Sequence, residues 1–507
     1  MFAPMYVRAM KGCCLLMKKR SIHTLGMIGA LVLLVMLCGF AEENTLVDQS
    51  TDFSASTWMV AFDQLHERFS KEYAFTDWKC IDWDMLGSAC RAEIQAAQHQ
   101  EDFEAYYIAL RRYVNAIPDG HVRMTYLPEI DQKHVGGGFG FTPVLLDNGA
   151  VIAVWVDEAS EAYHAGLRTG DELLTWNGLP IQEAAARIST IFAANAATDE
   201  DAALKRMAYL VRAAVGDKVE ITFRNDIGET YLVALTAYDD GMITMKKCYP
   251  VSVVSDRLRE MILDIQSDRP PLTSMVDFEI LDGNVAYIRV WGELDVDLTG
   301  SGSAPSTVAL FQSAVQSANG AGCKGLILDI RNNVGGLDDM AAALLGSFYT
   351  EETFYEYQND YDYANGTRVI QRAMSDSDEL MIEPAENVFT GRVIALINQK
   401  CVSSGEGVAL GIRNLPNGDT LGFYGTNGSF GLTGSEALMP GGLTVAWPAG
   451  QSLDANRKIQ IDSRDGIGGV EPTKRIPMTR ERALMVAQGK DVELEEALTI
   501  LNENRLQ

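Results

Sequence analysis

Apolar residues recur at every third or fourth position in the first part of the chain, a spacing that puts them on one face of a helix. The pattern runs over residues 56–73, "STWMVAFDQLHERFSKEY", and over residues 103–117, "FEAYYIALRRYVNAI". The segment closes with "PDGHVRM", in which Pro-Asp-Gly marks a turn. We therefore expect a helical region over residues 42–134.

Over residues 135–240 the pattern changes to short strands separated by glycines. The stretch "GGGFGFTPVLLDNGAVIAVWV" predicts two strands joined at a turn over Asp-Asn-Gly. The stretch "SEAYHAGLRTGDELLTWNG" predicts a short helix and a further strand, and "TIFAANAATDEDAALKRMAYL" predicts an additional helix. This region is therefore expected to be rich in β-structure.

From residue 275 to residue 507 strand-like runs alternate with helix-like runs. "NVAYIRVWGEL", "GLILDIR", "RVIALIN" and "DTLGFYG" predict strands, and "DDMAAALLGSFY" and "SSGEGVALGIRNL" predict helices. Such alternation is typical of an α/β layer with parallel strands. Residues 241–274 are expected to link this domain to the β-rich region.

The length and the charge of the chain narrow the class of protein. The chain has 507 residues, more than one ordinary core holds, which agrees with several domains. Its hydrophobic content of 47% is that of a folded protein, and its formal net charge is −27. Nucleic-acid binding depends on clustered Lys and Arg, so this charge argues against it.

The first 41 residues have the layout of a secretory signal. "MKKRSIHTLGMIGALVLLVMLCGFAEEN" begins with basic residues, continues with an apolar stretch and ends near small residues. Cleavage after Ala41, lipidation at Cys38 and an uncleaved membrane anchor are the alternatives. We therefore expect an exported protein of the cell envelope, the periplasm or the extracellular space, attached to a membrane only through this segment if at all.

Eight cysteines occur, and none forms a CxxC pair, so the sequence gives no zinc or redox motif and no metal site is expected. Cys80 and Cys90 are near enough in sequence to form a disulfide in an oxidising compartment. The alternative is a pair of buried thiols. The sequence leaves both open.

Two adjacent serines lie where a strand-like run ends and a helix-like run begins, in "INQKCVSSGEGVALGI". At such a turn Ser403 or Ser404 meets the unpaired N–H groups and the dipole of the helix start, which favour developing negative charge. The position therefore suits a nucleophile. Serines at this place also serve as N-caps, which is the alternative without catalysis.

A second stretch that carries chemistry is "LILDIRNNVGGLDDMAAALL", in which a strand leads through Asn-Asn-Val-Gly-Gly into a helix. Paired glycines let the backbone approach a ligand closely and turn its N–H groups toward it. Gly335 and Gly336 are therefore candidates for one side of an oxyanion hole, and the N–H of Ser404 for the other. A plain loop is the alternative.

The region over residues 135–240 resembles a PDZ domain. The resemblance rests on "AGLRTGDELLTWNG" and on the upstream Gly138-Phe139-Gly140-Phe141. In PDZ domains such a loop presents successive N–H groups to the terminal carboxylate of a peptide, which adds as a strand. The resemblance therefore implies peptide binding at Gly138, Phe139, Gly140 and Phe141. A packing or regulatory domain without a ligand is the alternative.

"LDIRNNVGG" followed by "CVSSGEG" resembles the C-terminal processing (tail-specific) peptidase family, whose members are serine endopeptidases with a PDZ domain. "YAFTDWKCIDWDML", "NVAYIRV" and "GIGGVEPTKRIPMT" also match that family in order, so the resemblance covers nearly all of the chain after residue 41. It implies a crotonase/ClpP-like α/β domain over residues 275–507. It also implies that Ser403, three residues before Glu406, is the nucleophile.

The best-known branch of the family pairs its serine with a downstream lysine, and the matching position here is Gly428. No lysine lies between Ser403 and Lys458, so another base is needed. Histidine is the usual candidate. His121, in "PDGHVRM", resembles the histidine of the His-using, tricorn-core-like branch, which implies that folding brings it to the serine.

A third group is expected to orient the imidazole. In the His-using branch this is an acid near a Gly-Val-x-Pro phrase, which here is "QIDSRDGIGGVEPT" with Asp462, Asp465 and Glu471. We take Asp465 as the expected member, and surface charges are the alternative for all three. Glu406, one helical turn after the nucleophile, is expected to support the helix start as in a capping box.

Together these features predict an exported serine endopeptidase that hydrolyses peptide bonds through an acyl-enzyme on Ser403, without a metal or organic cofactor. Polypeptides are the expected substrates, with their C-termini held by the PDZ domain. Two alternatives remain. One is a catalytically inactive protein on the same fold that binds peptides or apolar ligands. The other is an esterase-like hydrolase, against which the missing Gly-x-Ser-x-Gly elbow argues.

Overall fold

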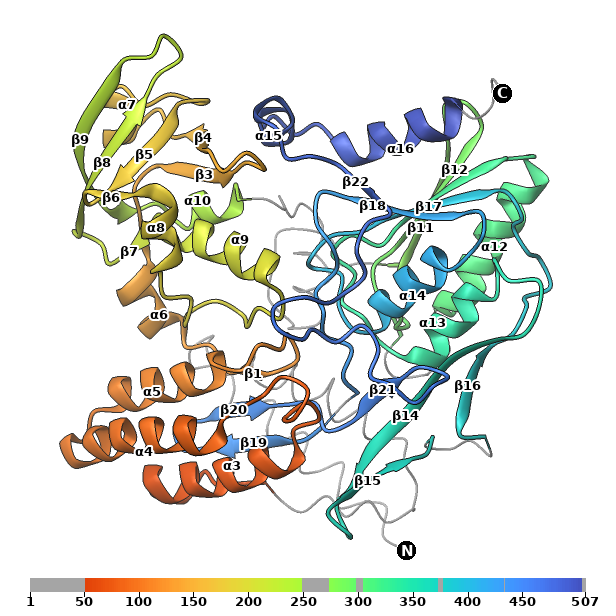
Figure 1. Ribbon diagram of the computed structural model, residues 1–507, viewed down its shortest axis with the longest axis horizontal. Helices are drawn as coiled ribbons and strands as arrows, with labels where there is room; N and C mark the ends of the chain where they lie inside the picture. Colours follow the sequence, from red (N-terminus) through yellow and green to blue (C-terminus); the bar gives the residue numbers. More distant parts are fainter. Residues whose placement is uncertain (1–50, 249–272, 298–303, 373–376, 433, 504–507) are drawn as a thin grey trace, which may run out of the picture.

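The computed structural model arranges the chain as a helical region, a β-rich region and an α/β domain (Figure 1). The described residues are 51–248, 273–297, 304–372, 377–432 and 434–503. The predicted signal over residues 1–41 and most of the predicted linker over residues 241–274 lie outside the described residues. Figure 1 shows the helical region (red and orange) and the β-rich region (yellow) on one side, and the α/β domain (green to blue) on the other.

The helical region confirms both helices that the apolar spacing predicts. It consists of α3 (Trp58–Glu72), α4 (Trp83–Gln100) and α5 (Phe103–Asn115), followed by β1 (Arg123–Met124) and α6 (Pro128–Val135). Side chains of Asp82 and Asp102 accept backbone N–H groups at the starts of α4 and α5, which fixes where these helices begin.

The core of the helical region is completed by strands from the end of the chain. Buried side chains of α3 and α5 pack against β19 (Glu436–Met439), β20 (Leu443–Ala446) and Trp447. β1 pairs with β20 in antiparallel fashion. The turn that carries His121 therefore continues directly into a strand anchored on residues of the C-terminal domain.

The β-rich region is built on one antiparallel sheet in the order β3-β4-β5-β8-β9. The predicted hairpin forms β3 and β4, joined at Gly149, whose φ is 85°. The bounds are β3 (Phe141–Leu145), β4 (Val151–Val156), β5 (Glu172–Trp176), β8 (Lys218–Arg224), β9 (Thr230–Thr236), the short strands β2 (Gly137–Gly138), β6 (Leu179–Pro180), β7 (Arg212–Ala213) and β10 (Tyr238–Asp239), and the helices α7 (Glu161–His164), α8 (Ile181–Ala186), α9 (Asp199–Leu210) and α10 (Ile243–Lys246).

The α/β domain has a six-stranded sheet in the order β11-β12-β13-β17-β18-β22, parallel except for β11. Leu326 and Leu328 pack with α12, α13 and α14, whereas Ile327 packs with α16, so helices cover both faces. The bounds are β11 (Val276–Leu281), β12 (Val285–Val290), β13 (Gly325–Asp329), β17 (Arg392–Leu396), β18 (Gly418–Gly422), β22 (Lys474–Arg475), α12 (Thr307–Gly320), α13 (Asp338–Leu345), α14 (Ser404–Arg413), α15 (Arg480–Ala487) and α16 (Val492–Glu503). The expected alternation and parallel sheet are confirmed.

A further sheet was not expected from the sequence. It is formed by β14 (Thr353–Asp362), β15 (Thr367–Ile370), β16 (Glu379–Ile382) and β21 (Gln451–Leu453). β14 reads "TFYEYQNDYD", in which tyrosines alternate with polar residues, but Thr353 and Asn359 interrupt the tyrosine face and the register against β16 shifts, which weakens the strand signal.

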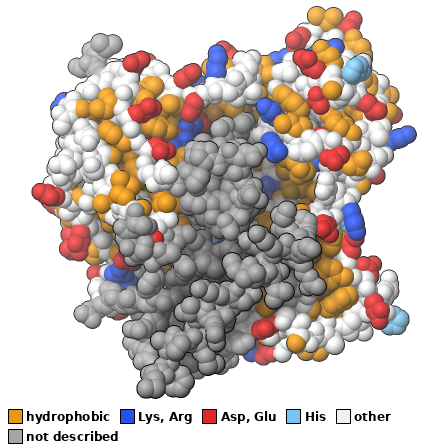
Figure 2. All heavy atoms as spheres, turned by 180° about the vertical axis from the view of Figure 1, so that it is seen from behind, with side chains coloured by type: hydrophobic (Ala, Val, Ile, Leu, Met, Phe, Trp, Pro, Cys, Tyr) orange, Lys and Arg blue, Asp and Glu red, His pale blue; other side chains and the backbone are white. Residues whose placement is uncertain are grey.

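The surface carries the negative charge of the chain in dispersed form. Figure 2 shows acidic side chains spread over the visible described surface rather than gathered in one patch. Within the described ranges, none of the helices has both the length and the apolar character needed to cross a membrane. The membrane attachment expected from residues 1–41 is therefore not tested by the described helices.

The two cysteines that the sequence places near each other are not bonded. Cys80 is an exposed free thiol and Cys90 a buried one. The Cys90 thiol donates to the carbonyl of Ala109 at 3.5 Å, and burial raises its pKa well above the usual value. Of the two alternatives, the structure shows unbonded thiols, only one of which is buried.

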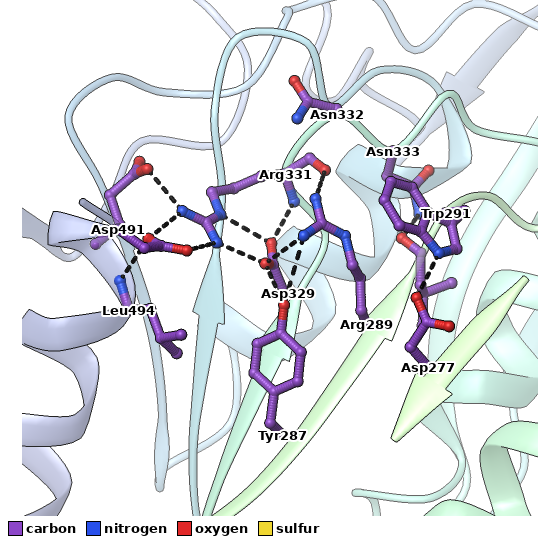
Figure 3. A network of polar contacts seen from close by, with 12 residues as sticks. Asp277, Tyr287, Arg289, Trp291, Asp329, Arg331, Asn332, Asn333, Asp491 and Leu494 are labelled. Carbon is purple, nitrogen blue, oxygen red and sulfur yellow. Dashed lines mark hydrogen bonds and ion pairs between the residues drawn. The ribbon is translucent and has the colours of Figure 1, made fainter. Parts of the chain in front are cut away.

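A buried network of ion pairs ties the end of β13 to the start of α16 (Figure 3). Arg331 donates to Asp329 at 2.6 Å and to Asp491 at 2.7 Å. Burial alone would raise the pKa of Asp329, but Arg331 and Arg289 beside it hold that pKa below its usual range. The network fixes the start of the loop that leads from β13 to Gly336.

Arg331→Met is expected to lower the free energy of unfolding by about 3 kcal/mol, because it leaves the buried carboxylate of Asp329 with less compensating charge. Chemical denaturation at neutral pH measures this value. The control is Arg91→Met, which removes an ion pair to Asp63 whose side chains are 44% and 49% exposed, and should cost less than about 1 kcal/mol. Equal losses in the two variants would contradict the role of the network.

Candidate active site

Ser403 lies at the turn from β17 into α14, as expected, and in a strained conformation. It occupies the N-cap position with φ 59° and ψ −136°, which is uncommon for a residue with a side chain and costs about 1–3 kcal/mol. Its side chain makes no capping hydrogen bond to the helix. The hydroxyl is therefore not used as an N-cap, which favours the alternative that it is a nucleophile.

Gly335 lies directly against this turn. Its φ is 79°, and a Cβ at this position would lie 2.5 Å from the Cβ of Ser403 and 2.8 Å from the carbonyl oxygen of Val402. Only glycine allows this approach without moving the turn. The predicted Gly-Gly loop and the predicted nucleophile are therefore neighbours in space, although they are far apart in the sequence.

Two backbone donors in this neighbourhood are unoccupied. Within the described part of the chain, the N–H groups of Gly336 and Ser404 donate to no acceptor. The N–H of Gly335 is already used, because it donates to the side chain of Asn333 at 2.8 Å. The hydroxyl of Ser404 donates to the carbonyl of Gly336 at 3.0 Å and holds the two segments together. Of the three predicted donors, the geometry leaves Gly336 and Ser404 available for an oxyanion.

A buried carboxyl group, that of Glu293, contacts the loop that carries Gly335 and Gly336. Glu293 is fully buried, and its N–H donates to the carbonyl of Gly335 at 3.1 Å. One carboxyl oxygen accepts from Asn333 at 2.8 Å, and the other has no hydrogen-bond partner among the described residues. Burial raises the pKa of Glu293 to about 7. No local sequence pattern predicts this residue, because its place depends on a bridge between distant segments.

His121 lies in the turn after α5, where it meets the acid Asp119 rather than one from the end of the chain. The Nδ1 atom of His121 is 3.7 Å from a carboxylate oxygen of Asp119, and the side chains are 21% and 0% exposed. Asp119 also accepts the backbone N–H of His121 at 2.9 Å and the hydroxyl of Tyr73 at 2.8 Å. Burial lowers the pKa of His121 below its usual value, and Asp119 opposes that shift only in part.

The His121 turn and the Ser403 turn are joined by one residue, Ser429. The hydroxyl oxygen of Ser429 accepts the N–H of Gly120 at 2.8 Å. Its carbonyl oxygen accepts the N–H of Ser403 at 3.1 Å. The structure therefore brings the predicted base and the predicted nucleophile into one neighbourhood.

The predicted third member, Asp465, lies in an exposed position. Its side chain is 83% exposed and 3.8 Å from Arg464, and its φ of 54° belongs to an exposed turn. Glu471 is exposed as well. Asp462 is buried, and it accepts the N–H of Phe430 at 2.9 Å. Asp119 is thus the acid that lies beside the imidazole of His121, whose Nδ1 atom makes no hydrogen bond among the described residues, and Asp465 as the third member stays a prediction.

A buried lysine, which the sequence reasoning missed, links the neighbourhoods of these acids. Lys79 donates to the carbonyl of Pro118 at 2.8 Å and to the hydroxyl of Ser463 at 2.9 Å. It is also 3.4 Å from a carboxylate oxygen of Asp462, and both side chains are 1% exposed.

Within the described ranges, no group of three or more His, Cys, Asp or Glu side chains could hold a metal ion.

Glu406 draws its hydrogen bonds chiefly from the loop over residues 426–429, and the N–H of Ser403, the donor of a capping box, is the weakest of the four donors that lower its pKa. Its carboxylate accepts the hydroxyl of Thr426 at 2.5 Å and the N–H groups of Gly428 at 2.8 Å and Ser429 at 2.9 Å. Burial raises the pKa of Glu406 to about 7, although these donors act in the opposite direction. The carboxylate holds the loop over residues 426–429. The N–H of Ser403 donates to the carbonyl oxygen of Ser429 in that loop.

The residues predicted to bind peptide are engaged in the packing of the β-rich region. Gly138 belongs to β2, the central strand of a sheet in the order β10-β2-β7. Phe139 and Phe141 are 3% and 0% exposed and belong to the core of this region. A Cβ at Gly140 would lie 2.6 Å from the hydroxyl oxygen of Ser160. Peptide binding by these residues, and the PDZ assignment itself, stay predictions.

Comparison with known proteins identifies the domain that carries this site. Residues 284–476 match the sequence profile of Peptidase family S41, and these residues include Gly336 and Ser403. No protein with a curated description matches the chain in sequence. The profile confirms the predicted peptidase family and the predicted enzyme class, a serine-type peptidase. His121 lies outside the matched residues.

Two solved structures share the fold over most of the chain. Mature CPAF complexed with lactacystin is 15% identical, with 88% of this chain and 99% of that chain covered at a TM-score of 0.58. Mature CPAF is 16% identical, with 88% of this chain and 98% of that chain covered at a TM-score of 0.59. At these identities the likeness establishes the fold alone. It agrees with the predicted α/β class with a helical N-terminal region.

Glu293→Gln is expected to remove a pH-dependent loss of stability. The carboxyl has a pKa of about 7 in the folded chain against an ordinary 4.5, so the folded state binds its proton more tightly than the unfolded state does. Stability from this group is present below the ordinary pKa and is lost as the pH rises through 7. Relative to the wild-type chain, the variant should gain about 3 kcal/mol between about pH 5 and about pH 8.

Chemical denaturation across this pH range measures the difference for each variant. The control is Glu279→Gln in the exposed part of β11, which should leave the pH dependence unchanged. A Glu293→Gln variant that loses stability with rising pH as steeply as the wild-type chain would contradict the buried carboxyl.

Proposed function

We propose that this chain, which carries a peptidase family S41 domain over residues 284–476, is an endopeptidase that cuts polypeptides through an acyl-enzyme on Ser403. The observation that carries the proposal is the turn at Ser403. Its hydroxyl is not used as a cap, two N–H groups beside it have no acceptor among the described residues, and Ser429 connects it to the His121 turn.

In the proposed reaction His121 accepts the proton of the Ser403 hydroxyl, and the oxygen attacks the carbonyl carbon of the peptide bond. The N–H groups of Gly336 and Ser404 donate to the oxyanion, and the start of α14 adds its dipole. His121 then gives the proton to the leaving amine. A water molecule hydrolyses the ester, again with His121 as base, and the serine is restored.

The surroundings of His121 suit a general base. A base must be neutral before it accepts a proton, and burial lowers the pKa of His121 and so favours the neutral ring. The carboxylate of Asp119 lies on the Nδ1 side at 3.7 Å and stabilises the imidazolium that forms during the reaction. Asp119 is fully buried, and contacts with the His121 N–H and the Tyr73 hydroxyl fix its place.

We also propose where the enzyme works and how substrates reach it. The signal-like layout of residues 1–41 supports export to the cell envelope or beyond, with attachment through that segment as the alternative. The PDZ-like phrases over residues 135–240 support capture of substrate C-termini by the β-rich region. Capture at Gly138 requires displacement of β10 or of β7, because both strands pair with it.

Ser403→Ala should abolish both peptide cleavage and labelling by a fluorophosphonate, with a fall in kcat of about 10⁶-fold. His121→Ala should reduce turnover about as severely, because nucleophile and base act as a unit. Ser404→Ala keeps the backbone donor and should be milder. Mass spectrometry of the labelled chain locates the modified residue. Labelling that survives in Ser403→Ala, or a wild-type chain that neither labels nor cleaves, would contradict the proposal, and the second result would favour a binding protein.

Asp119→Asn should lower kcat by about 10²- to 10⁴-fold, because the imidazole loses the charge that stabilises its protonated form. The matched control is Asp465→Asn, which changes an exposed side chain and should leave kcat within about twofold of the wild-type value. Steady-state kinetics on one peptide substrate measure both variants. The reverse order of effects would restore Asp465 as the third member.

A further inference from the structure

We propose that Ser429 is a positioning residue that sets the place of His121 relative to Ser403. The proposal rests on the proposed function, since it concerns the approach of the same base to the same nucleophile. Ser429 does not need to touch the substrate for this role. It acts through two neighbours, Gly120 on the side of the base and the backbone of Ser403 on the side of the nucleophile.

Ser429 makes one hydrogen bond to each of the two turns. Its hydroxyl oxygen accepts the N–H of Gly120 at 2.8 Å, across 309 positions of sequence. Its carbonyl oxygen accepts the N–H of Ser403 at 3.1 Å. Ser429 is fully buried, so its own hydroxyl and carbonyl oxygens are shielded from water. The first bond holds Gly120, the neighbour of the proposed base His121. The second holds the proposed nucleophile Ser403 itself.

Ser429 can serve as a reference point because its own place is fixed. Its N–H donates to the carboxylate of Glu406 at 2.9 Å, and the N–H of Gly428 donates to the same carboxylate at 2.8 Å. Glu406 is fully buried in the first turn of α14. The nucleophile turn, the helix that follows it and the loop with Ser429 therefore form one hydrogen-bonded unit.

The His121 turn packs closely against this unit at Gly120. A Cβ at Gly120 would lie 3.2 Å from the hydroxyl oxygen of Ser429 and closer still to the side chain of Asn427. On the other flank of Gly120, Asp119 is held by Tyr73. The hydroxyl of Ser429 thus connects the loop beside Ser403 to the backbone of Gly120, the residue immediately before His121.

Removal of this hydroxyl has a specific consequence. Ser429→Ala keeps the carbonyl that accepts from Ser403, so the nucleophile turn retains its bond. The N–H of Gly120 loses its acceptor, and the His121 turn can shift. A misplacement of about 1 Å costs on the order of 100-fold in rate. KM should stay unchanged, because no substrate contact is removed.

The experiment compares Ser429→Ala with Ser347→Ala in the full chain. Ser347 is a fully buried serine whose hydroxyl makes no hydrogen bond among the described residues, so its variant controls for the loss of a buried oxygen. Steady-state kinetics on a peptide substrate give kcat and KM. Hydrogen–deuterium exchange followed by mass spectrometry reports on the Gly120 amide.

The expected result for Ser429→Ala is a fall in kcat of about 100-fold at unchanged KM, with faster exchange at Gly120. Ser347→Ala should show neither effect. A kcat for Ser429→Ala within about threefold of that for Ser347→Ala would overturn the proposal while leaving the peptidase in place. If the wild-type chain cleaves no peptide, the proposed function fails separately. Hydrogen–deuterium exchange in Ser429→Ala then decides. An unchanged exchange rate of the Gly120 amide overturns the positioning contact, and faster exchange supports it.

Discussion

The structure depends on one meeting of distant segments, the contact of the His121 turn with the turn at Ser403. Two hydrogen bonds to Ser429 join them, and the pairing of β1 with β20 anchors the His121 side on the C-terminal domain. This junction brings the proposed base, His121, and the proposed nucleophile, Ser403, into one neighbourhood, although no continuous helix or strand joins their turns. The helical region shares its core with β19 and β20 and thereby supports the His121 turn.

The electrostatics of the site fit a reaction in which negative charge develops beside Ser403. The start of α14 and the N–H groups of Gly336 and Ser404 present positive ends of dipoles to that position. The carboxyl groups beneath it, Glu293 and Glu406, have pKa values raised to about 7 by burial. Protonation at or below neutral pH therefore reduces the negative charge that would oppose an oxyanion. Ser403 has a strained φ, and the turn that holds it approaches Gly335 so closely that a Cβ at Gly335 would clash with it.

The sequence predicted those features whose signal is local. The strand-to-helix turn at Ser403 and the Gly-Gly loop follow from short motifs, and the family match supports the peptidase class. The acid beside His121 was missed, because Asp119 was interpreted as part of a turn, whereas Asp465 points into solvent. Ser429 and β14 were also missed. Ser429 meets the His121 turn through Gly120, which lies 309 positions away in the sequence, and the alternation in β14 is interrupted at Thr353 and Asn359.

The central claim is that His121 and Ser403 act on the same peptide carbonyl. A peptidyl chloromethyl ketone tests this directly, because the serine oxygen adds to its ketone while the histidine nitrogen displaces chloride from the adjacent carbon. Mass spectrometry of the inactivated chain should locate the alkylated nitrogen at His121, and Ser403→Ala should abolish that alkylation. Alkylation at another residue, or at His121 with equal rate in Ser403→Ala, would contradict the account.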